Sequence, residues 1–196
     1  MKRSWIVIIV LIILVFAGYI FFAGKYNQMV TMDESVITQW ANVETQYQRR
    51  ADLIPNLVNT VKGFAQQEQD VLVGVTEARA KASSIQIDPS NLDAASMQRF
   101  QEAQGEVSSA LSRLLVTVER YPELKSNQNF LELQAQLEGT ENRIAVERRR
   151  FNESVQGYNT YIRRFPNTMV AGMFGFERKT QFAAQEGADA APEVTF

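Results

Sequence analysis

Four polar side chains interrupt the apolar stripes of this chain and are its best candidates for chemistry. Apolar residues recur every three or four positions over long stretches, as expected of helices that pack together, and the four polar residues occupy positions of the same series. They are Glu68, Gln104, Glu141 and Arg148. A lone buried carboxylate is costly, so we expect Arg148 to pair with Glu68 or Glu141 across the interior. This buried polar layer fits either an acid–base or ligand site or a structural layer that fixes helix register, and the structural interpretation is the commoner use of such groups.

Composition removes most other kinds of site. The sequence has no His and no Cys, which excludes thiolate chemistry, disulfides and every His-based nucleophile or zinc arrangement. Glu138 and Glu141 resemble half of a di-iron carboxylate helix, but that site needs a Glu-x-x-His on two helices. Nucleotide, hydrolase and calcium-loop motifs are also missing. We therefore predict a protein that is not an enzyme and has no metal or cofactor site.

The polar residues must be positioned by long helices. The stripes predict soluble helices over residues 27–51, 57–82, 89–120 and 127–164. Asp52 and Pro55 predict a kink or reversal after the first of them, because proline removes an amide hydrogen and Asp52 can cap a new start. Only residues 193–196 resemble a strand. Short connections between long helices predict an all-α, up-and-down antiparallel four-helix bundle with coiled-coil-like packing.

A membrane anchor is predicted before the bundle. Residues 5–23 (WIVIIVLIILVFAGYIFFA) contain no charged side chain, and a helix of that length reaches roughly 28 Å, close to the ~30 Å hydrocarbon thickness of a bilayer. A cleaved signal peptide has a shorter apolar stretch and an A-x-A-like site, and a buried core helix needs apolar surroundings that the remaining chain does not supply. Lys2 and Arg3 precede the run, which favours a cytoplasmic N-terminus and an outward-facing bundle. We expect the first soluble helix to continue this membrane helix.

The segment after the bundle differs in composition from the rest. It is apolar, too short to span a bilayer, and contains Phe165, Met169, Met173, Phe174 and Phe176. A satellite core is narrowly favoured, with an interfacial membrane foot or an oligomer contact as the alternatives. The chain thus divides into a basic flank (1–4), a transmembrane helix (5–23), a bundle (24–164), the apolar post-bundle segment (165–184) and a flexible acidic tail (185–196).

Several ordered motifs resemble a known family. They are Arg49-Arg50-Ala-Asp52-Leu-Ile-Pro55-Asn56, Tyr121-Pro122-Glu-Leu124-Lys125-Ser-Asn127, Leu137-Glu138-Gly139-Thr140-Glu141-Asn142-Arg143-Ile144 and Phe151-Asn152 through Phe165-Pro166. Together they are similar to the LemA family over almost the whole chain. The resemblance implies a bacterial membrane protein with one N-terminal span, an up-and-down helical bundle and no established enzymatic activity. Family members often have His where this chain has Gln67, so a metal or proton function of that His has no counterpart here.

These observations predict a non-enzymatic scaffold or adaptor of the bacterial inner membrane, with its bundle on the periplasmic or extracellular side. Its expected partners are the bilayer, through residues 5–23, and envelope proteins such as a membrane protease. The formal net charge of −2 argues against nucleic acid. An alternative is a self-assembling, membrane-shaping protein that forms large homo-oligomers. A third interpretation, a ligand-binding envelope sensor, requires a polar cavity at Glu68, Glu141 and Arg148 rather than a closed ion pair.

Overall fold

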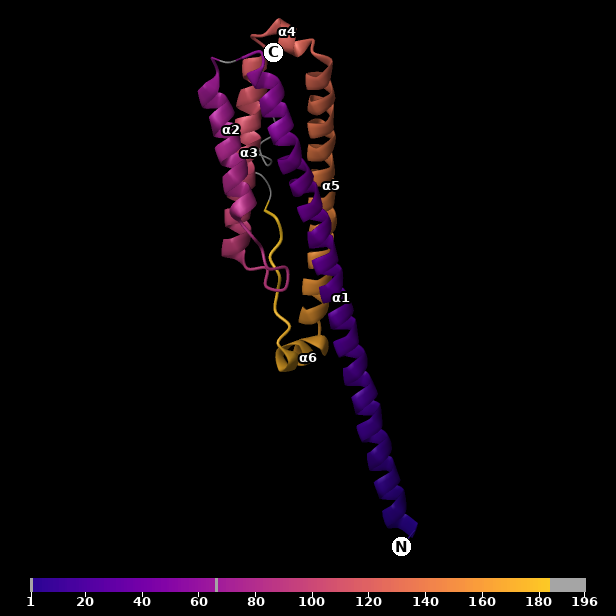
Figure 1. The fold of residues 1–196 in the computed structure, drawn as a ribbon. Helices are drawn as coiled ribbons and strands as arrows, with labels where there is room; N and C mark the ends of the chain where they lie inside the picture. Colours follow the sequence, from indigo (N-terminus) through magenta and orange to yellow (C-terminus); the bar gives the residue numbers. More distant parts are fainter. Residues whose placement is uncertain (1, 66, 184–196) are drawn as a thin grey trace, which may run out of the picture.

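The computed structural model describes residues 2–65 and 67–183, and within these ranges the chain is all-helical, without a strand. Its helices are α1 (Lys2–Lys62), α2 (Gln69–Ser84), α3 (Ala94–Val118), α4 (Pro122–Lys125), α5 (Gln128–Arg163) and α6 (Asn167–Phe174). The strand expected over residues 193–196 and the flexible tail expected over residues 185–196 lie outside the described residues. The described helices form one elongated body with a long N-terminal projection (Figure 1).

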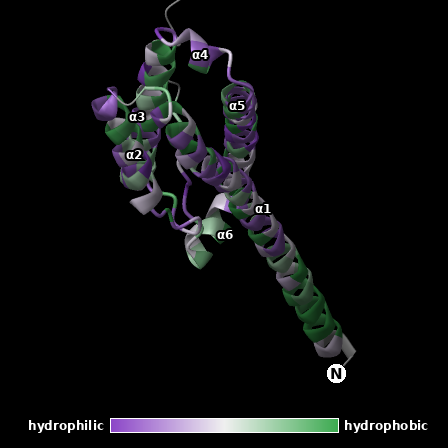
Figure 2. Ribbon diagram, turned by 45° about the horizontal axis from the view of Figure 1, so that its top comes forward, coloured by the Kyte–Doolittle hydropathy of each residue, from purple (hydrophilic) through white to green (hydrophobic). Residues whose placement is uncertain are grey.

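The projection is the first half of α1, a single helix of 61 residues. Its most apolar 18-residue window has a mean hydropathy of 3.2 and is 0% buried, so among the described helices α1 alone is long and apolar enough to cross a membrane. The hydrophobic half points away from the other helices, whereas the second half packs among them (Figure 2). As expected, the first soluble helix continues the apolar one without a break.

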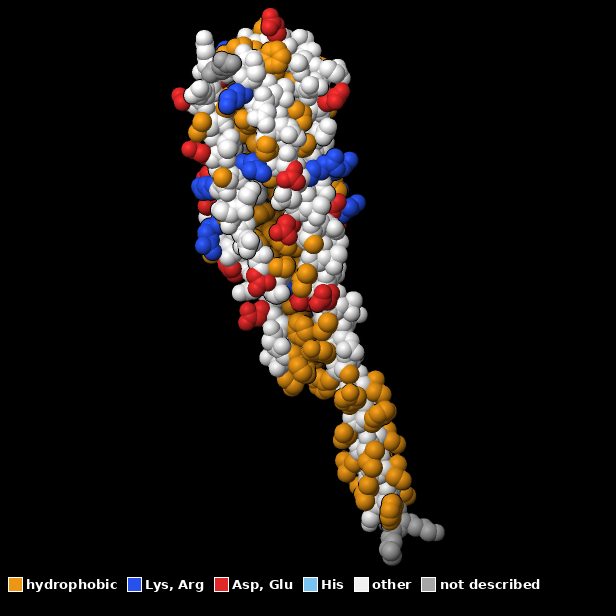
Figure 3. Space-filling view, viewed as in Figure 1, with side chains coloured by type: hydrophobic (Ala, Val, Ile, Leu, Met, Phe, Trp, Pro, Cys, Tyr) orange, Lys and Arg blue, Asp and Glu red, His pale blue; other side chains and the backbone are white. Residues whose placement is uncertain are grey.

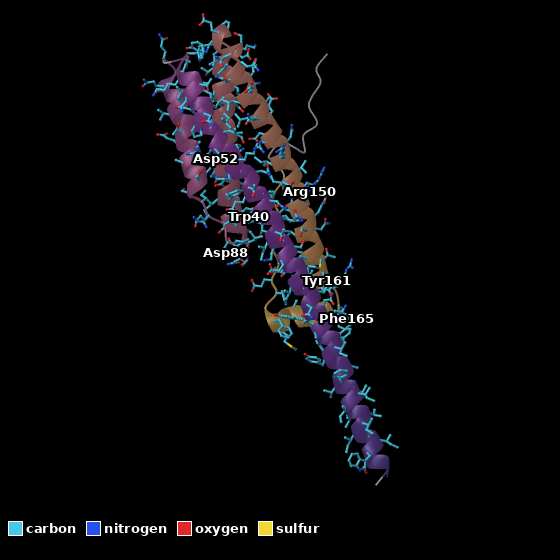
Figure 4. All side chains as sticks on the ribbon, turned by 45° about the vertical axis from the view of Figure 1, so that its right-hand side comes forward. Trp40, Asp52, Asp88, Arg150, Tyr161 and Phe165 are labelled. Carbon is cyan, nitrogen blue, oxygen red and sulfur yellow. The ribbon has the colours of Figure 1, made fainter. Side chains whose placement is uncertain are left out.

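The break predicted at Asp52 and Pro55 is wrong. Asp52 lies on an uninterrupted stretch of α1 (Figure 4), where it accepts a hydrogen bond from Gln48 Nε2 at 2.9 Å instead of capping a new helix. Pro55 cannot donate to the carbonyl of Ala51, but Arg79 Nε on α2 donates to that oxygen at 2.6 Å. The helix continues because a side chain from a neighbouring helix replaces the missing backbone bond.

The chain instead reverses over residues 63–68, between α1 and α2. The helix predicted over residues 57–82 therefore joins the last turn of α1 to most of α2. Phe64 shows the consequence, because it lies within that predicted helix but falls in the turn and is 41% exposed, while the next residue, Ala65, is 1% exposed. The seven-residue spacing of apolar positions continues across the turn, which is why the pattern did not reveal it.

The later helices agree better with the predicted ranges because their starts carry clear caps. The Asp93 side chain accepts the amide of Ser96 at 2.9 Å at the start of α3, and Asn127 accepts the amide of Phe130 at 3.1 Å at the start of α5. The single turn of α4 between them begins with Pro122 at its first helical position.

The helices pack in two pairs, α1 beside α5 and α2 beside α3, and α1 also contacts α2 (Figure 1). Buried side chains form two clusters along this body. The cluster nearer the apolar projection joins residues 29–47 of α1 to the second half of α5, the start of α3 and α6. The other joins residues 54–61 of α1 to α2, α3, α4 and the first half of α5. Because α1 contributes to both clusters, the presumptive anchor and the domain core share one helix.

Candidate functional site

A buried arginine ties three helices together near the middle of the domain. Arg50 on α1 is 2% exposed. Its Nη1 donates to Glu141 Oε1 on α5 at 2.8 Å and to Ser108 Oγ on α3 at 3.0 Å. Its Nη2 donates to the backbone oxygen of Gln104 at 3.2 Å and also to the side-chain oxygen of that residue. The guanidinium is thus surrounded by protein acceptors, as a buried cation requires.

The surroundings of Arg50 suit a structural tie better than a reacting site. The Glu141 side chain is 42% exposed, so water solvates part of the carboxylate. Tyr47 lies beside the guanidinium, with Arg50 Cζ 5.1 Å from its ring centroid, and burial raises the pKa of the Tyr47 hydroxyl. A hollow of about 210 Å³ adjoins Arg50 and Gln104. Among the described residues, no group of three or more His, Cys, Asp or Glu is placed to hold a metal ion.

Two members of the predicted polar layer, Gln104 and Glu141, meet at this centre, and both are partly exposed. Glu68 does not join them. It lies in the turn before α2, where it accepts a hydrogen bond from the Tyr121 hydroxyl at 3.0 Å and pairs with Arg120 Nη2 at 3.2 Å. Glu68 is therefore separated from Gln104 and Glu141.

Arg148 also lies apart from the two carboxylates. Its Cζ is 4.6 Å from the centroid of the Phe182 ring, and its Nη2 donates to the carbonyl of Ala183 at 3.2 Å. The expected pairing of Arg148 with Glu68 or Glu141 is wrong, because Glu141 is paired with Arg50 and Glu68 with Arg120. The Phe182 ring, and not the expected carboxylate, lies next to the Arg148 guanidinium.

The predicted layer lacked Arg50, although the sequence contained a signal for it. The first-helix stripe of Trp40, Val43 and Tyr47 continues through Arg50 to Ile54 in steps of three, four, three and four. The helix predicted over residues 27–51 contains Arg50, but its apolar stripe was followed only as far as Tyr47. One more step of three residues would have placed Arg50 in the interior.

The segment that carries Phe182 forms a second built feature, here named the C-terminal strap and defined as residues 177–183. It runs extended beside α5 (Figure 1). Asn159 pairs with both backbone groups of Lys179, accepting its amide at 3.0 Å and donating to its carbonyl at 2.8 Å. Asn152 does the same for Phe182, at 2.8 and 3.1 Å. Seven helical residues rise ~10.5 Å and three extended residues span ~10 Å, so the two asparagines match the strap in register.

Two strap side chains reach into the domain. Lys179 Nζ is buried against Asp33 Oδ1 at 2.8 Å and donates to the carbonyl of Ser90 at 3.1 Å. Phe182 stacks on Trp40 with ring centroids 5.8 Å apart and meets Phe151 edge-on at 5.4 Å. The strap thereby covers the core cluster that lies nearer the apolar projection. No periodic pattern in residues 177–183 predicts this packing.

The apolar post-bundle segment forms α6 and lies beside α1 just above the apolar run. Val170 and Ala171 are buried, so one face of α6 extends the core as the satellite-core interpretation expected. The opposite face is open. The exposed fractions are 81% for Phe165, 59% for Met169, 70% for Met173 and 52% for Phe174, while Phe176 is partly buried. Figure 4 shows Phe165 at the lower end of α5, beside α1.

Residues 39–196 match the family model of the LemA family. The chain belongs to the LemA family. It is 29% identical over 182 residues to the magnetosome protein MamQ of Magnetospirillum gryphiswaldense, covering 84% of this chain and 67% of that protein. It is also 21% identical over 168 residues to protein LemA of Metamycoplasma hominis, covering 86% and 73% of the two chains. These matches and the apolar start of α1 indicate a membrane-associated helical protein.

Proposed function

We propose that this LemA family protein is a non-enzymatic scaffold or adaptor of the bacterial envelope, anchored in the inner membrane by residues 5–23. The observation that carries the proposal is the continuity of α1, which passes from an apolar run with 0% burial into both core clusters. Such a helix transmits the pose of the anchor to the whole domain. The four long segments α1, α2, α3 and α5 then act as an up-and-down bundle that presents its outer faces to envelope partners, such as a membrane protease.

The proposed topology has a cytoplasmic N-terminus, supported by Lys2, Arg3 and the amino terminus before the run against the single Lys25 directly after it. The natural chain has no Cys, so single cysteines report position cleanly. In intact spheroplasts, a membrane-impermeant maleimide should label Asn129→Cys at the start of α5 and leave Ser4→Cys unlabelled until the membrane is permeabilised. The reverse pattern would overturn the proposed orientation.

Self-assembly into large membrane-shaping homo-oligomers is the second candidate, and the open apolar face of α6 is the observation that favours it. The native mass of the full chain in mild detergent separates the two functions. A monomer or small oligomer that co-purifies with a different envelope protein after crosslinking in the membrane supports the adaptor. A large ring or array supports assembly and contradicts the adaptor.

A ligand-binding sensor is the least supported of the three. It requires a polar cavity at Glu68, Glu141 and Arg148 rather than closed ion pairs, whereas Glu141 is paired with Arg50 and Glu68 with Arg120. The terminal nitrogens of Arg50, the partner of Glu141, are thus bonded within the domain. This favours a structural function of the polar residues, as the scaffold proposal requires.

A further inference from the structure

The open face of α6 and the loop before it form a compact apolar patch at the membrane-proximal end of the domain. We name this patch the foot and define it as Phe165, Met169, Met173 and Phe174. We infer that the foot lies in the headgroup layer of an anionic bilayer and fixes the domain against the membrane surface. The inference rests on the proposed function in one respect, because it takes residues 5–23 as the membrane span.

The first support is height above the span. The last strongly apolar residue of the exposed run is Phe22, and Tyr26 follows it by four residues, or ~6 Å along a helix axis. The Tyr26 ring lies 4.9 Å from the ring of Phe174 and 5.6 Å from that of Phe176. A headgroup layer is ~5–8 Å deep on each side of the hydrocarbon, so α6 stands at the depth of this layer.

The second support is continuity between the foot and the span. Figure 3 shows hydrophobic side chains at the lower end of the domain directly above the hydrophobic rod of α1, while charged side chains gather farther up. Helices α6 and α1 are in contact, so the foot and the apolar run are neighbours in space and do not merely overlap in this view. A bilayer that surrounds the rod therefore reaches the foot without a gap.

The third support is charge. Lys25 lies at the start of the domain, with its Nζ 5.8 Å from the centroid of the Tyr161 ring, and Arg163 and Arg164 are exposed at the end of α5. No acidic residue occurs in residues 4–32 or 160–176. Carboxylates follow these ranges at Asp33, Glu34 and Glu177, but the three cations lie nearer in sequence to the end of the span or to the foot. Cations beside an apolar patch match an anionic lipid surface.

The area of the foot argues for lipid over a second copy of the chain. Four large side chains of ~200 Å² each, exposed by half to four-fifths, present on the order of 500 Å². A stable protein interface takes ~800 Å² from each partner, whereas partition into a bilayer has no such threshold. The foot is large enough for the membrane and too small to hold two domains together.

The test uses the full chain in vesicles with an environment-sensitive fluorophore on one introduced cysteine. Met173→Cys probes the foot, and Val116→Cys on α3 is the matched control, because Val116 is 71% exposed and Met173 is 70% exposed. Val116 lies near the end of α3 beside α4, far from the apolar projection (Figure 1). The vesicles contain phosphatidylcholine with or without phosphatidylglycerol, and a lipid with a spin label near its headgroup acts as quencher.

We expect the probe at position 173 to shift to the blue and to lose at least about half of its emission to the lipid quencher, since ~5–10 Å of burial brings it within reach. The control should respond only to iodide in the water. The lipid quenching at 173 should be stronger with phosphatidylglycerol, and Arg163→Glu combined with Arg164→Glu should remove that increase.

Three results would overturn the inference. Equal iodide quenching at both positions shows that the foot is in water. A blue-shifted probe at 173 that the lipid quencher does not reach shows that protein covers the foot. Lipid quenching at position 173 that does not depend on phosphatidylglycerol shows that the foot has no preference for an anionic surface. Release of the chain from the vesicles by an alkaline wash is a different failure. It would show that residues 5–23 do not span the bilayer, and it would contradict the proposed function as well.

Discussion

At the scale of single residues, Arg50 is the member of the polar centre whose loss should cost more than that of Arg148 or Glu141. Arg50→Met leaves the Glu141 carboxylate and the oxygens of Gln104 and Ser108 without their cation, so we expect a loss of about 2–4 kcal/mol in the free energy of unfolding. Arg148→Met removes a cation–π contact with Phe182 and should cost about 1 kcal/mol. Thermal unfolding in detergent micelles, followed by near-ultraviolet circular dichroism, measures both.

Glu141→Gln is the control for this comparison. The amide oxygen still accepts from Arg50, and the Glu141 side chain is 42% exposed, so the change should cost less than about 1 kcal/mol. If Arg148→Met proved as damaging as Arg50→Met, the central tie would not be at Arg50.

Tyr158, beneath the strap, should make the domain sensitive to alkali. Burial, with Asp33 and Glu177 nearby, raises the pKa of Tyr158 from its ordinary 10.0 to about 12. Between these values the unfolded chain loses the proton and the folded chain keeps it, so this contribution to stability is full below pH 10 and falls as the pH rises toward 12. Midpoints of thermal unfolding from pH 8 upward should fall less steeply in Tyr158→Phe than in the natural chain. Parallel curves would contradict the assignment.

The candidate residues could be predicted only where helix periodicity alone decides position. Gln104 and Glu141 both contact Arg50, although both are partly exposed, because α3 and α5 are regular over the relevant turns. The partner of Glu141 was missed because Arg50, although it lies within the helix predicted over residues 27–51, is a charged residue and was not counted in the apolar stripe. Arg148 was assigned a carboxylate because nothing in the periodicity indicates that Phe182 returns to cover it. Long-range side-chain contacts of this kind leave no period in the sequence.

At the scale of elements, the continuity of α1 through Pro55 should depend on Arg79. Arg79→Met should destabilise the domain by about 1 kcal/mol, because it leaves the carbonyl of Ala51 without a donor. In a Pro55→Ala background the restored amide can bond that carbonyl, so the same Arg79 substitution should cost much less. The double-mutant cycle measures this coupling directly. Additive effects would mean that Arg79 stabilises the fold through some other contact.

The strap should depend on its two asparagines in a matched way. Asn159→Ala removes both hydrogen bonds to the backbone of Lys179, and Asn152→Ala removes those to Phe182. Each change should cost about 1–3 kcal/mol and speed amide hydrogen exchange within residues 179–182. Asn129→Ala, on an exposed part of α5, is the control and should leave strap exchange unchanged. Unchanged exchange in both strap variants would show that the side chains of Lys179 and Phe182 hold the strap alone.

Helices were predictable where local capping and periodicity agree, and were misplaced where they disagree. Asp93 and Asn127 cap α3 and α5, and the predicted ranges contain both helices. Between α1 and α2 the heptad spacing passes across a turn, so the reversal was assigned to the only proline nearby. The strap was missed for a different reason: an extended segment held by asparagine side chains of α5 shows neither helical nor strand periodicity.

At the scale of the whole molecule, one rigid helix and a foot should together hold the domain at a fixed height. Seven residues of Ala, Glu and Lys inserted between Ala23 and Gly24 lengthen α1 by ~10.5 Å and lift α6 above the headgroup layer. The same number of Gly and Ser residues makes a flexible linker that lets the foot return to the membrane. With the fluorophore at position 173, the helical insertion should abolish lipid quenching, and the flexible insertion should retain most of it.

This pair of insertions distinguishes a strut from a tether because both lengthen the chain equally. If the helical insertion retained quenching, α1 would have to bend or tilt at the membrane, and the continuity of the helix would not fix the pose of the domain. If both insertions abolished quenching, the foot would lack enough affinity to find the bilayer by itself, and its place in the headgroup layer would follow from α1 alone. If the flexible insertion retains quenching and the helical insertion abolishes it, both α1 and the foot are needed. The rigid helix then sets the height of the domain, and the foot has its own attraction to lipid.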